Sequence, residues 1–261
     1  SLQEHRMPSA VQAVAAALIE AHASRRAANA APLEGALPGP DAAYLVQEQV
    51  ARALDWFDEG MAQHWKSGGP SRTGPLTHAP LPPANVMASP ADARGTHFHL
   101  RLIEAGIALR LARDVSPAEA VALTHEAAPA LVDAMAVSIE VVDSRWQQAR
   151  EAGALLKLAD LQSHGALVLG AWQPFVARDW SAQACSVQIG DTAARDFRGT
   201  HSLGDPAWLL PIWLRHLTRH GEAVPRGTVV TTGTWCGMLE AKKGDRVRVV
   251  FEGIGEAQVQ L

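Results

Sequence analysis

The sequence predicts an α+β fold in which a mixed β structure forms the body and a helical segment precedes it. The 261 residues are 48% hydrophobic and 19% charged, which is typical of a globular chain. A chain of this length buries roughly 70–75% of its unfolded surface. Alanines and leucines recur at helical spacing near the N-terminus, and the remainder consists mostly of strand-like runs with few helices between them. That order favours segregated elements over a doubly wound parallel sheet.

Residues 1–60 are expected to form an N-terminal helical arm. Alanine and leucine spacing predicts a helix over residues 11–29. Residues 32–40 are rich in helix breakers and predict a loop. Asp41 is a suitable N-cap for a second helix that ends near Trp56. The arm therefore consists of two predicted helices joined by a loop.

Residues 61–261 are expected to form a mixed β catalytic-type domain, in one compact unit with the arm. The glycines and prolines of residues 68–70 and 75–83 predict a loop too irregular for any element. Helices are expected over residues 116–126 and 205–219. The strand candidates, rich in β-formers, are residues 98–111, 136–142, 165–171, 183–189, 228–232, 246–251 and 256–261.

Composition excludes several classes of protein. The net charge of −4 gives no electrostatic footprint for nucleic acid. No apolar run approaches the roughly 18 residues that a membrane span needs. The N-terminal region lacks the apolar core of a secretory signal. Cys185 and Cys236 form no disulfide framework, so a reducing cytoplasm is the simplest compartment. We expect a cytoplasmic protein that binds neither nucleic acid nor membranes.

Two glutamates lie within otherwise apolar, strand-like runs: Glu104 in residues 101–110 and Glu140 in residues 138–145. A buried carboxylate costs several kcal/mol unless something neutralises it, and a divalent cation is a common reason to keep one. Carboxylate oxygens suit Mg²⁺ or Mn²⁺. The alternative is that both glutamates flank a sheet edge and reach solvent. Strand residues two apart share a face, so Glu104 points with Gly106.

Both runs resemble metal-binding strands of the 2-keto-4-pentenoate hydratase/4-oxalocrotonate decarboxylase branch of the fumarylacetoacetate hydrolase superfamily. That branch usually reads Ile-Glu-Ala-Glu where residues 103–106 of this chain read Ile-Glu-Ala-Gly. The glycine, Gly106, stands in place of one metal ligand that the resemblance implies, as in a divergent member. The resemblance implies a mixed β-roll or sandwich of the C-terminal-domain type. It also implies a weakly bound Mg²⁺ or Mn²⁺ at Glu104 and Glu140. Gly106→Glu is then expected to tighten metal binding by restoring two carboxylates on one strand face.

Lys66 is the candidate catalytic residue. Its segment, residues 64–69, resembles the family's Tyr/Arg-Lys-Ile-Gly-Leu stretch and places Lys66 on the active-site lysine. A lysine beside a metal and an apolar wall can have a lowered pKa and move protons to an enol. Lys66→Ala is expected to lower activity and leave the thermal midpoint nearly unchanged. The alternative is an ordinary surface lysine. The family's next loop carries an aspartate used by hydratases, whereas residues 82–86 contain no acid here.

Residues 158–170 resemble the family's Ala-Asp-Asn-Ala-Ser-Ser-Gly stretch, with Asp160 and Ser163 on matching positions. Ser163 is a candidate for binding the substrate carboxylate, with a turn role as the alternative. Asp160 fits a residue that ties a turn. His164 is either a surface histidine or a replacement proton donor. Thr234, in a stretch that resembles the superfamily's Leu-Thr-Gly-Thr turn, can offer a hydroxyl to the substrate.

The resemblance implies a divalent-metal-dependent hydratase/decarboxylase-type lyase that acts on a short 2-hydroxy-dienoate or 2-oxo acid through a metal-bound enolate, as in aromatic meta-cleavage catabolism. Decarboxylation needs only an electron sink, so it tolerates loss of the loop acid better than hydration does. One alternative is an acylpyruvate hydrolase, which needs a base to activate water. Another is a non-catalytic relative that binds a ligand or serves as a partner subunit. The resemblance further implies a homo-oligomer or a complex with a related subunit.

Overall fold

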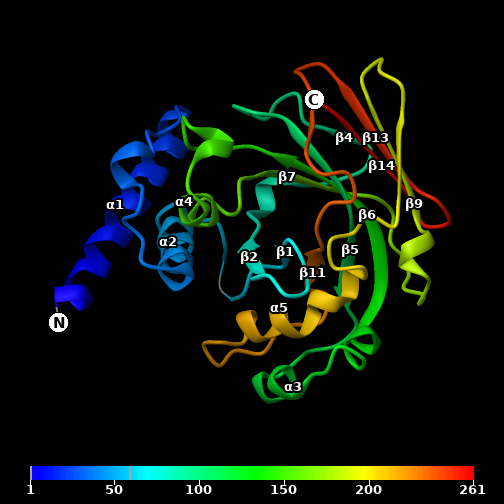
Figure 1. Ribbon diagram of the computed structural model, residues 1–261, viewed down its shortest axis with the longest axis horizontal. Coiled ribbons are helices and arrows are strands. Elements are labelled where there is room, and N and C mark those ends of the chain that lie inside the picture. The colour runs from blue at the N-terminus through cyan, green and yellow to red at the C-terminus, as the bar shows by residue number, and fades with distance from the viewer. Residues whose placement is uncertain (1, 59) are drawn as a thin grey trace.

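The computed structural model describes residues 2–58 and 60–261. Its strands form curled sheets flanked by helices, which confirms the α+β fold class (Figure 1). Helices α1, α2 and α4 cover one side of the molecule, and α3 and α5 lie at its lower end in this view. The helices are α1 (Leu2–Ser24), α2 (Pro40–Ala53), α3 (Pro117–Ala122), α4 (Ala154–Ala159) and α5 (Leu210–Leu217).

The larger sheet contains nine strands within the described residues, seven of them in the order β2-β1-β11-β5-β6-β7-β3. Strand β12 also pairs with β5, and β8 with β6. The pairs β1·β11 and β3·β7 are parallel, and the other pairs are antiparallel. The bounds are β1 (His64–Gly68), β2 (Thr77–Pro80), β3 (Val86–Ala88), β5 (Leu102–Leu111), β6 (Val132–Val142), β7 (His164–Leu169), β8 (Gln173–Pro174), β11 (Val229–Thr231) and β12 (Leu239–Glu240).

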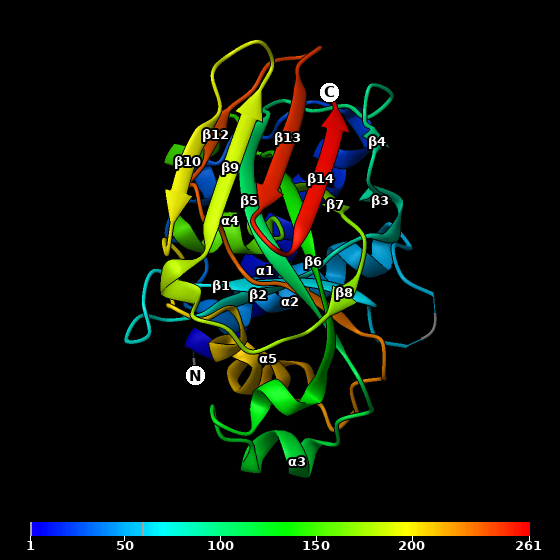
Figure 2. The ribbon, with the colours of Figure 1, turned by 90° about the vertical axis from the view of Figure 1, so that its right-hand side faces the viewer.

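A second sheet, in the order β10-β9-β13-β14-β4, covers one face of the first. Figure 2 shows β9, β13 and β14 side by side in front of β5 and β6. Buried residues from both sheets, such as Ile103, Ile107, Val247 and Val249, form one continuous core between them. The bounds are β4 (Ala91–Asp92), β9 (Ala184–Ile189), β10 (Arg195–Arg198), β13 (Arg246–Phe251) and β14 (Gly255–Gln260).

Side chains along β5 alternate between this core, on one face of the larger sheet, and the opposite face, which we call the functional face. Ile103, Ala105 and Ile107 point into the core between the sheets. Because successive strand residues point to opposite faces, Glu104 and Gly106 project from the other face of the larger sheet. The period-2 pattern of β5 therefore fixes which residues are available for chemistry.

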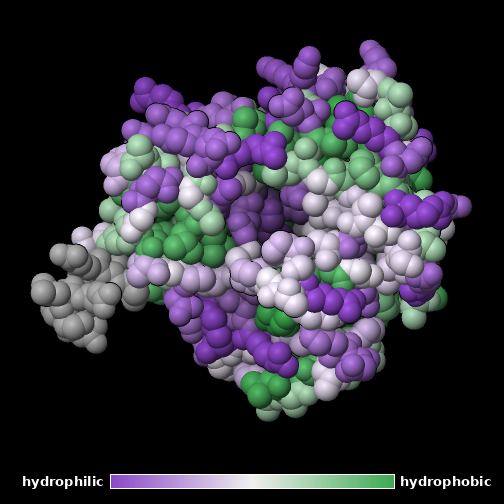
Figure 3. Space-filling view, viewed as in Figure 1, coloured by the Kyte–Doolittle hydropathy of each residue, from purple (hydrophilic) through white to green (hydrophobic). Residues whose placement is uncertain are grey.

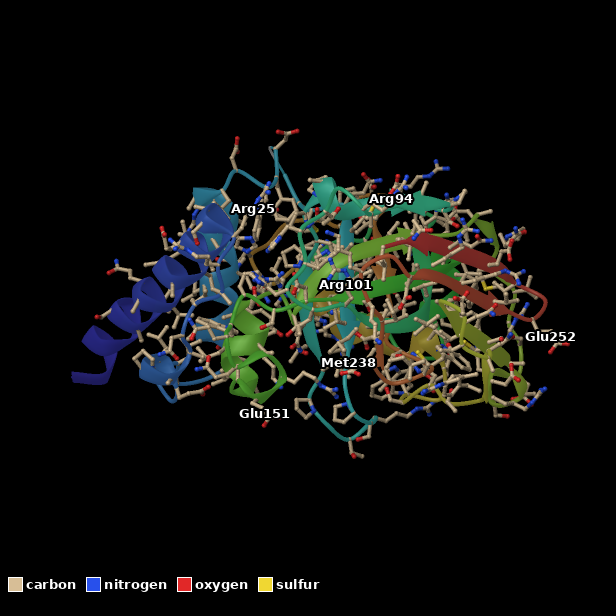
Figure 4. The ribbon with its side chains drawn as sticks, turned by 90° about the horizontal axis from the view of Figure 1, so that it is seen from above. Arg25, Arg94, Arg101, Glu151, Met238 and Glu252 are labelled. Carbon is tan, nitrogen blue, oxygen red and sulfur yellow. The ribbon has the colours of Figure 1, made fainter. Side chains whose placement is uncertain are left out.

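The helices on the opposite side form a core of their own. Buried residues of α1 and α2 pack there against Trp146 and α4. The second helix begins one residue before the predicted cap: Gly39 is the N-cap, Pro40 occupies the first turn, and Asp41 lies inside the helix. Figure 4 shows the side chains labelled Arg25 and Glu151 at this helical end and Glu252 at the other end of the molecule. None of the described helices is both long and apolar enough to cross a membrane.

The prediction of an irregular loop is wrong for β2, which lies inside residues 75–83, and for Gly68, the last residue of β1. Strand β2 pairs with β1, and β1 also pairs with β11. Backbone pairing overrides the low strand propensity of such a segment. This correction matters because β2 supports β1, which carries Lys66.

A buried histidine behind β1 should make stability depend on pH. His78 is 3% exposed, lies 2.9 Å from the Ser67 hydroxyl and stacks on His216. Burial, with a smaller contribution from Arg219, lowers the pKa of His78 from 6.5 to about 3. The unfolded chain therefore binds more protons below pH 6.5, and stability is lost as the pH falls towards 3. One such group contributes about 1.4 kcal/mol per pH unit.

Urea unfolding followed between pH 7 and pH 4.5 measures this dependence. His78→Gln, which can still hydrogen-bond Ser67, should show a shallower fall in stability with decreasing pH than the wild type. His220→Gln is the matched control, because His220 is exposed at the surface. Parallel profiles for all three proteins would contradict the assignment of this proton linkage to His78.

Candidate active site

A cavity of about 550 Å³ opens on the functional face of the larger sheet. The molecular face seen in Figure 1 is hollowed near its middle, with hydrophilic residues in the hollow (Figure 3). The charged residues that line the cavity are one lysine and two glutamates, and the remaining lining residues are small or neutral. The lining residues are Lys66, Ser67, Gly68, Gly69, Pro70, Pro75, Thr77, Glu104, Glu140, Gln162, Ser202, Gly233 and Thr234.

Strand register brings the three charged residues together. Glu104 on β5 and Glu140 on β6 are direct register partners, so their side chains project side by side. Lys66 lies on β1, where burial alternates and Lys66 shares the cavity face with Gly68. The structure thus places Lys66, Glu104 and Glu140 in one cavity.

Lys66 and Glu140 form a buried ion pair. Lys66 Nζ lies 3.0 Å from Glu140 Oε1, and the two side chains are 12% and 6% exposed. Lys66 Nζ also donates to the backbone carbonyl of Gln162 at 3.0 Å. Apart from the ion pair, Glu140 Oε1 accepts no hydrogen bond from a described residue. The ammonium therefore has two fixed neighbours and a remaining N–H that can face the cavity.

Mutual electrostatics shift the proton affinities of this group. Burial and the neighbouring Glu140 carboxylate raise the pKa of Glu104 from 4.5 to about 7, against the opposing effect of Lys66. Burial acts to lower the pKa of Lys66, but the carboxylates of Glu140 and Glu104 outweigh it, and the pKa is raised. The expectation of a lowered lysine pKa is therefore wrong for the protein alone. Lys66 is an ammonium that can hold and donate a proton.

A left-handed turn holds the carbonyl that binds Lys66. Leu161, Gln162 and Ser163 have φ values of 51°, 53° and 59°, a sparsely populated region for side-chain-bearing residues. The turn follows Asp160, whose buried carboxylate accepts from Arg145 Nε at 2.7 Å and from Arg145 N at 2.9 Å. This anchor confirms that Asp160 ties a turn. The Gln162 side chain also donates to the Thr77 hydroxyl, across from Lys66.

Two expected substrate-binding residues differ in their position. Ser163 does not line the cavity; its backbone carbonyl accepts from Asp143 N at 2.9 Å. Thr234 does line the cavity, but its hydroxyl donates to Gly237 O at 2.6 Å. Sequence reasoning missed Gln162, because the resembled motif has a small residue there and no local pattern predicts three consecutive left-handed residues.

Three further histidines and Cys236 lie outside the cavity lining. His97 and His99 pack edge to face with ring centroids 4.8 Å apart, beside a separate pocket. His164 is buried rather than exposed, so the surface-histidine interpretation is wrong. Neither ring nitrogen of His164 has a partner among the described residues, and burial lowers its pKa well below 6.5. Burial also raises the pKa of Cys236, which disfavours a thiolate nucleophile.

The expected restoration of a metal ligand at position 106 is contradicted by the packing. A Cβ built on Gly106 would lie 2.6 Å from the Gly233 carbonyl oxygen and 3.2 Å from Ser138 Oγ. A backbone atom cannot yield as the end of a flexible side chain can. Glutamate therefore has no room at this position without movement of the Gly233 turn.

Gly106→Glu is expected to lower the free energy of unfolding by about 1–3 kcal/mol or more, because it overpacks a closed contact and adds a third carboxylate beside two others. Gly68→Glu is the matched control. It adds the same side chain at a residue that lines the cavity, where the nearest atom to its Cβ is Gly233 Cα at 3.9 Å. Chemical denaturation compares the two variants. Equal stability in both would show that the Gly233 turn moves freely.

The donor set at the cavity fits a hard cation with few protein ligands. Within the described part of the chain, no group of three or more His, Cys, Asp or Glu side chains is placed to hold a metal ion. Glu104 and Glu140 nevertheless offer two adjacent carboxylates, and the Lys66 ammonium, 3.0 Å away, is the only described partner of Glu140 Oε1. Divalent cations such as Mg²⁺ accept one or two carboxylates and complete their shell with water or substrate.

Comparisons with known proteins agree with this architecture. Residues 57–261 match the family described as "Fumarylacetoacetate (FAA) hydrolase C-terminal". The chain is 30% identical over 260 residues to 2-keto-4-pentenoate hydratase 1 of Dechloromonas aromatica (strain RCB), covering 92% of this chain and 93% of that protein. It is 32% identical over 161 residues to hydratase 2 of the same organism, covering 59% of this chain and 57% of that protein.

Solved structures share the fold. The 4-oxalocrotonate decarboxylase from Pseudomonas putida G7, complexed with calcium and acetate, has a TM-score of 0.77 at 17% identity, covering 97% of both chains. The same enzyme complexed with magnesium and adipate has a TM-score of 0.77 at 18% identity, covering 96% of both chains. Fumarylpyruvate hydrolase from Pseudomonas aeruginosa, in complex with Mn²⁺ and pyruvate, has a TM-score of 0.54 at 16% identity, covering 77% of this chain and 89% of that one.

Proposed function

The chain belongs to the fumarylacetoacetate hydrolase C-terminal family, and on this premise we propose that it is a lyase of the hydratase/decarboxylase type. Its substrate would be a short 2-hydroxy-dienoic or 2-oxo acid. The observation that carries the proposal is the cavity in which Lys66 faces Glu104 and Glu140. The relatives named hydratase and decarboxylase support the same reaction class.

Glu104 and Glu140 would hold a divalent cation, for which the calcium, magnesium and manganese complexes of the structural relatives give support. When bound there, such a cation supplies a template for the substrate carboxylate and a Lewis acid for charge on the adjacent oxygen. The protein contributes two fixed carboxylates and a small, neutral rim that admits a short substrate.

Lys66 would hold the proton that the reaction moves. Its ammonium is fixed by Glu140 and by the Gln162 carbonyl, which leaves an N–H for the substrate. An ammonium beside a developing enolate can stabilise the negative charge and then donate its proton to carbon. Fixed neighbours keep the side chain in place, so the group needs little reorganisation during the reaction.

Decarboxylation fits this cavity better than hydration or hydrolysis. Adding water to an alkene, or cleaving a carbon–carbon bond with water, requires a group that activates the water. Both lining carboxylates, Glu104 and Glu140, are assigned to the cation, and no histidine or aspartate lines the cavity within the described residues, so no further base is left to activate water. Loss of carbon dioxide requires only an electron sink. We therefore rank decarboxylase above hydratase, and acylpyruvate hydrolase below both.

Turnover assays test the function directly. The wild-type protein, with Mg²⁺ or Mn²⁺, would be given 2-hydroxypentadienoate and oxalocrotonate in parallel. Decarboxylation of oxalocrotonate supports the first choice, and water addition to 2-hydroxypentadienoate supports the second. A folded, cation-loaded protein that turns over neither substrate would favour a non-catalytic relative or partner subunit. Light scattering of the same sample measures whether it is an oligomer.

Cation binding should depend on Glu140. Glu140→Gln removes one charged ligand at nearly constant size, so Mg²⁺ or Mn²⁺ affinity should fall by roughly tenfold or more in calorimetric titration. Glu252→Ala is the control, since Glu252 is exposed at the far end of the molecule (Figure 4). Equal affinities in wild type and Glu140→Gln would remove this pair of carboxylates from consideration.

A further inference from the structure

The turn that carries Gly233 is bonded to β5 on both sides of Gly106. Thr232 N donates to Ile107 O at 3.1 Å, and Trp235 N donates to Ala105 O at 2.7 Å. These two bonds flank Gly106 and hold the Gly233 carbonyl directly over it. A Cβ on residue 106 would lie 2.6 Å from that oxygen. The carbonyl therefore occupies the place from which a side chain at position 106 would start.

The Gly233 oxygen is also unpartnered. Its neighbours in the turn are bonded, since Thr232 O accepts from His201 Nε2 at 2.6 Å and Trp235 O accepts from Thr200 Oγ1 at 2.5 Å. No described residue donates a hydrogen bond to Gly233 O. Gly233 has a φ of 102°, a conformation that favours glycine, and it lines the same cavity as the two glutamates. The turn thus holds the Gly233 carbonyl oxygen in a fixed position without a hydrogen-bond donor from the described residues.

We propose that the Gly233 carbonyl is the third protein oxygen of a cation site formed with Glu104 and Glu140. The proposal rests on the cation site assigned above under the proposed function. A neutral backbone oxygen replaces the carboxylate that Gly106 cannot carry. Carbonyl oxygens are established ligands of hard divalent cations, and Ca²⁺ accepts them more readily than Mg²⁺, which demands near-octahedral geometry and keeps its waters.

The neutral ligand makes cation binding depend on the substrate. Two carboxylates carry a formal charge of −2 and Lys66 carries +1, so a divalent cation leaves the site with a net positive charge. An anionic 2-oxo acid that chelates the cation would remove this excess. Cation and acid should therefore bind together, each weakly alone. The ligand class is a small chelating 2-oxo carboxylate, for which pyruvate is the probe.

Calorimetry and NMR on the full chain test the proposal. Pyruvate, a 2-oxo acid whose calcium salt is soluble, should raise the affinity for Ca²⁺ by roughly tenfold or more, and Ca²⁺ should bind at least as tightly as Mg²⁺. Labelling with ¹³C-carbonyl glycine and ¹⁵N-threonine reports only Gly-Thr pairs, which end at residues 96, 200, 228 and 234. The Gly233 carbonyl signal should shift on addition of Ca²⁺ with pyruvate, and the other three should stay in place.

Two variants each add one methyl group, at positions 106 and 68, which differ in what surrounds the new Cβ. Gly106→Ala pushes against the Gly233 carbonyl and should weaken Ca²⁺ binding by roughly tenfold or more. Gly68→Ala, whose Cβ meets only Gly233 Cα at 3.9 Å, should leave the affinity within about twofold. If Gly106→Ala fails to fold, the shift of the Gly233 carbonyl signal in the wild type decides whether this carbonyl binds the cation.

The possible failures are distinct. Ca²⁺ binding that requires Glu140 but leaves the Gly233 carbonyl signal unshifted overturns the carbonyl ligand and leaves the cation site standing. Tight Ca²⁺ binding that is indifferent to pyruvate overturns the dependence on substrate. A wild type that binds neither Ca²⁺ nor Mg²⁺, with or without pyruvate, removes the cation site of the proposed function and this ligand with it.

Discussion

Lys66→Ala is expected to lower kcat and kcat/KM together by about 10²–10⁴-fold, the usual contribution of a positioned acid–base group. The physical reason is the position of the Lys66 ammonium, 3.0 Å from Glu140 Oε1 and 3.0 Å from the Gln162 carbonyl, on the cavity wall. Steady-state kinetics with dienoate and oxalocrotonate substrates measure the effect. Full activity in a folded alanine variant would exclude Lys66 from the chemistry.

The thermal midpoint of Lys66→Ala should also fall, in contrast to the expectation from sequence that it would stay nearly unchanged. In the alanine variant, the buried Glu140 carboxylate lacks the Lys66 ammonium as its charge partner and lies beside the carboxylate of Glu104. Breaking such a pair costs about 3–5 kcal/mol. The sequence shows a lysine but not the carboxylate it pairs with, so this cost could not be foreseen.

Lys66→Arg separates charge from proton transfer. A guanidinium keeps the positive charge opposite Glu140 but does not release its proton near neutral pH. This variant should retain more stability than Lys66→Ala and still lose activity. Lys243→Ala is a control for removal of an exposed lysine. If Lys66→Arg keeps full activity, the role of the residue is its charge alone.

The pair of glutamates was predictable because strand chemistry is local. An acid inside an apolar run, together with the alternation of strand side chains, identifies both the residue and the face from which it projects. The direct register of Glu104 with Glu140 was not predictable, since register depends on the pairing of β5 with β6. The arrangement needed for cation binding therefore required the structure.

The contacts that shape the rest of the site join segments far apart in sequence. Gly233 closes over Gly106, and Gln162 reaches both Lys66 and Thr77. The glycine of the first turn suits its positive φ, but the turn at Gln162 adopts a conformation that its own residues do not favour. Leu161 illustrates this, because a leucine at φ 51° has no local preference for that conformation. Tertiary bonds stabilise what the local sequence disfavours.

Those tertiary bonds converge on Arg145. Its Nε and backbone N donate to the Asp160 carboxylate, and its Nη2 donates to His164 O at 2.6 Å. The two bonded residues, Asp160 and His164, bracket the left-handed turn that carries the Gln162 carbonyl. The Arg145 and Asp160 side chains are 10% and 2% exposed, so water cannot replace either partner. The position of the Lys66 ammonium thus depends indirectly on this buried pair.

Asp160→Asn is therefore expected to lower the free energy of unfolding by up to about 3–5 kcal/mol, because it removes the carboxylate that binds Arg145 most closely and leaves the buried guanidinium with only Asp143 Oδ2, at 3.7 Å, as a charged partner. Asp92→Asn provides the matched control. Asp92 pairs with Arg94 at 2.8 Å, but the two side chains are 57% and 68% exposed, and such a surface pair contributes about 0–1 kcal/mol.

Urea unfolding of the two variants, Asp160→Asn and Asp92→Asn, gives the comparison. Equal losses of stability would mean that the Arg145–Asp160 pair does not anchor the turn. A large loss for Asp160→Asn alone, with activity falling at temperatures below global unfolding, would show that the turn opens first and releases Lys66.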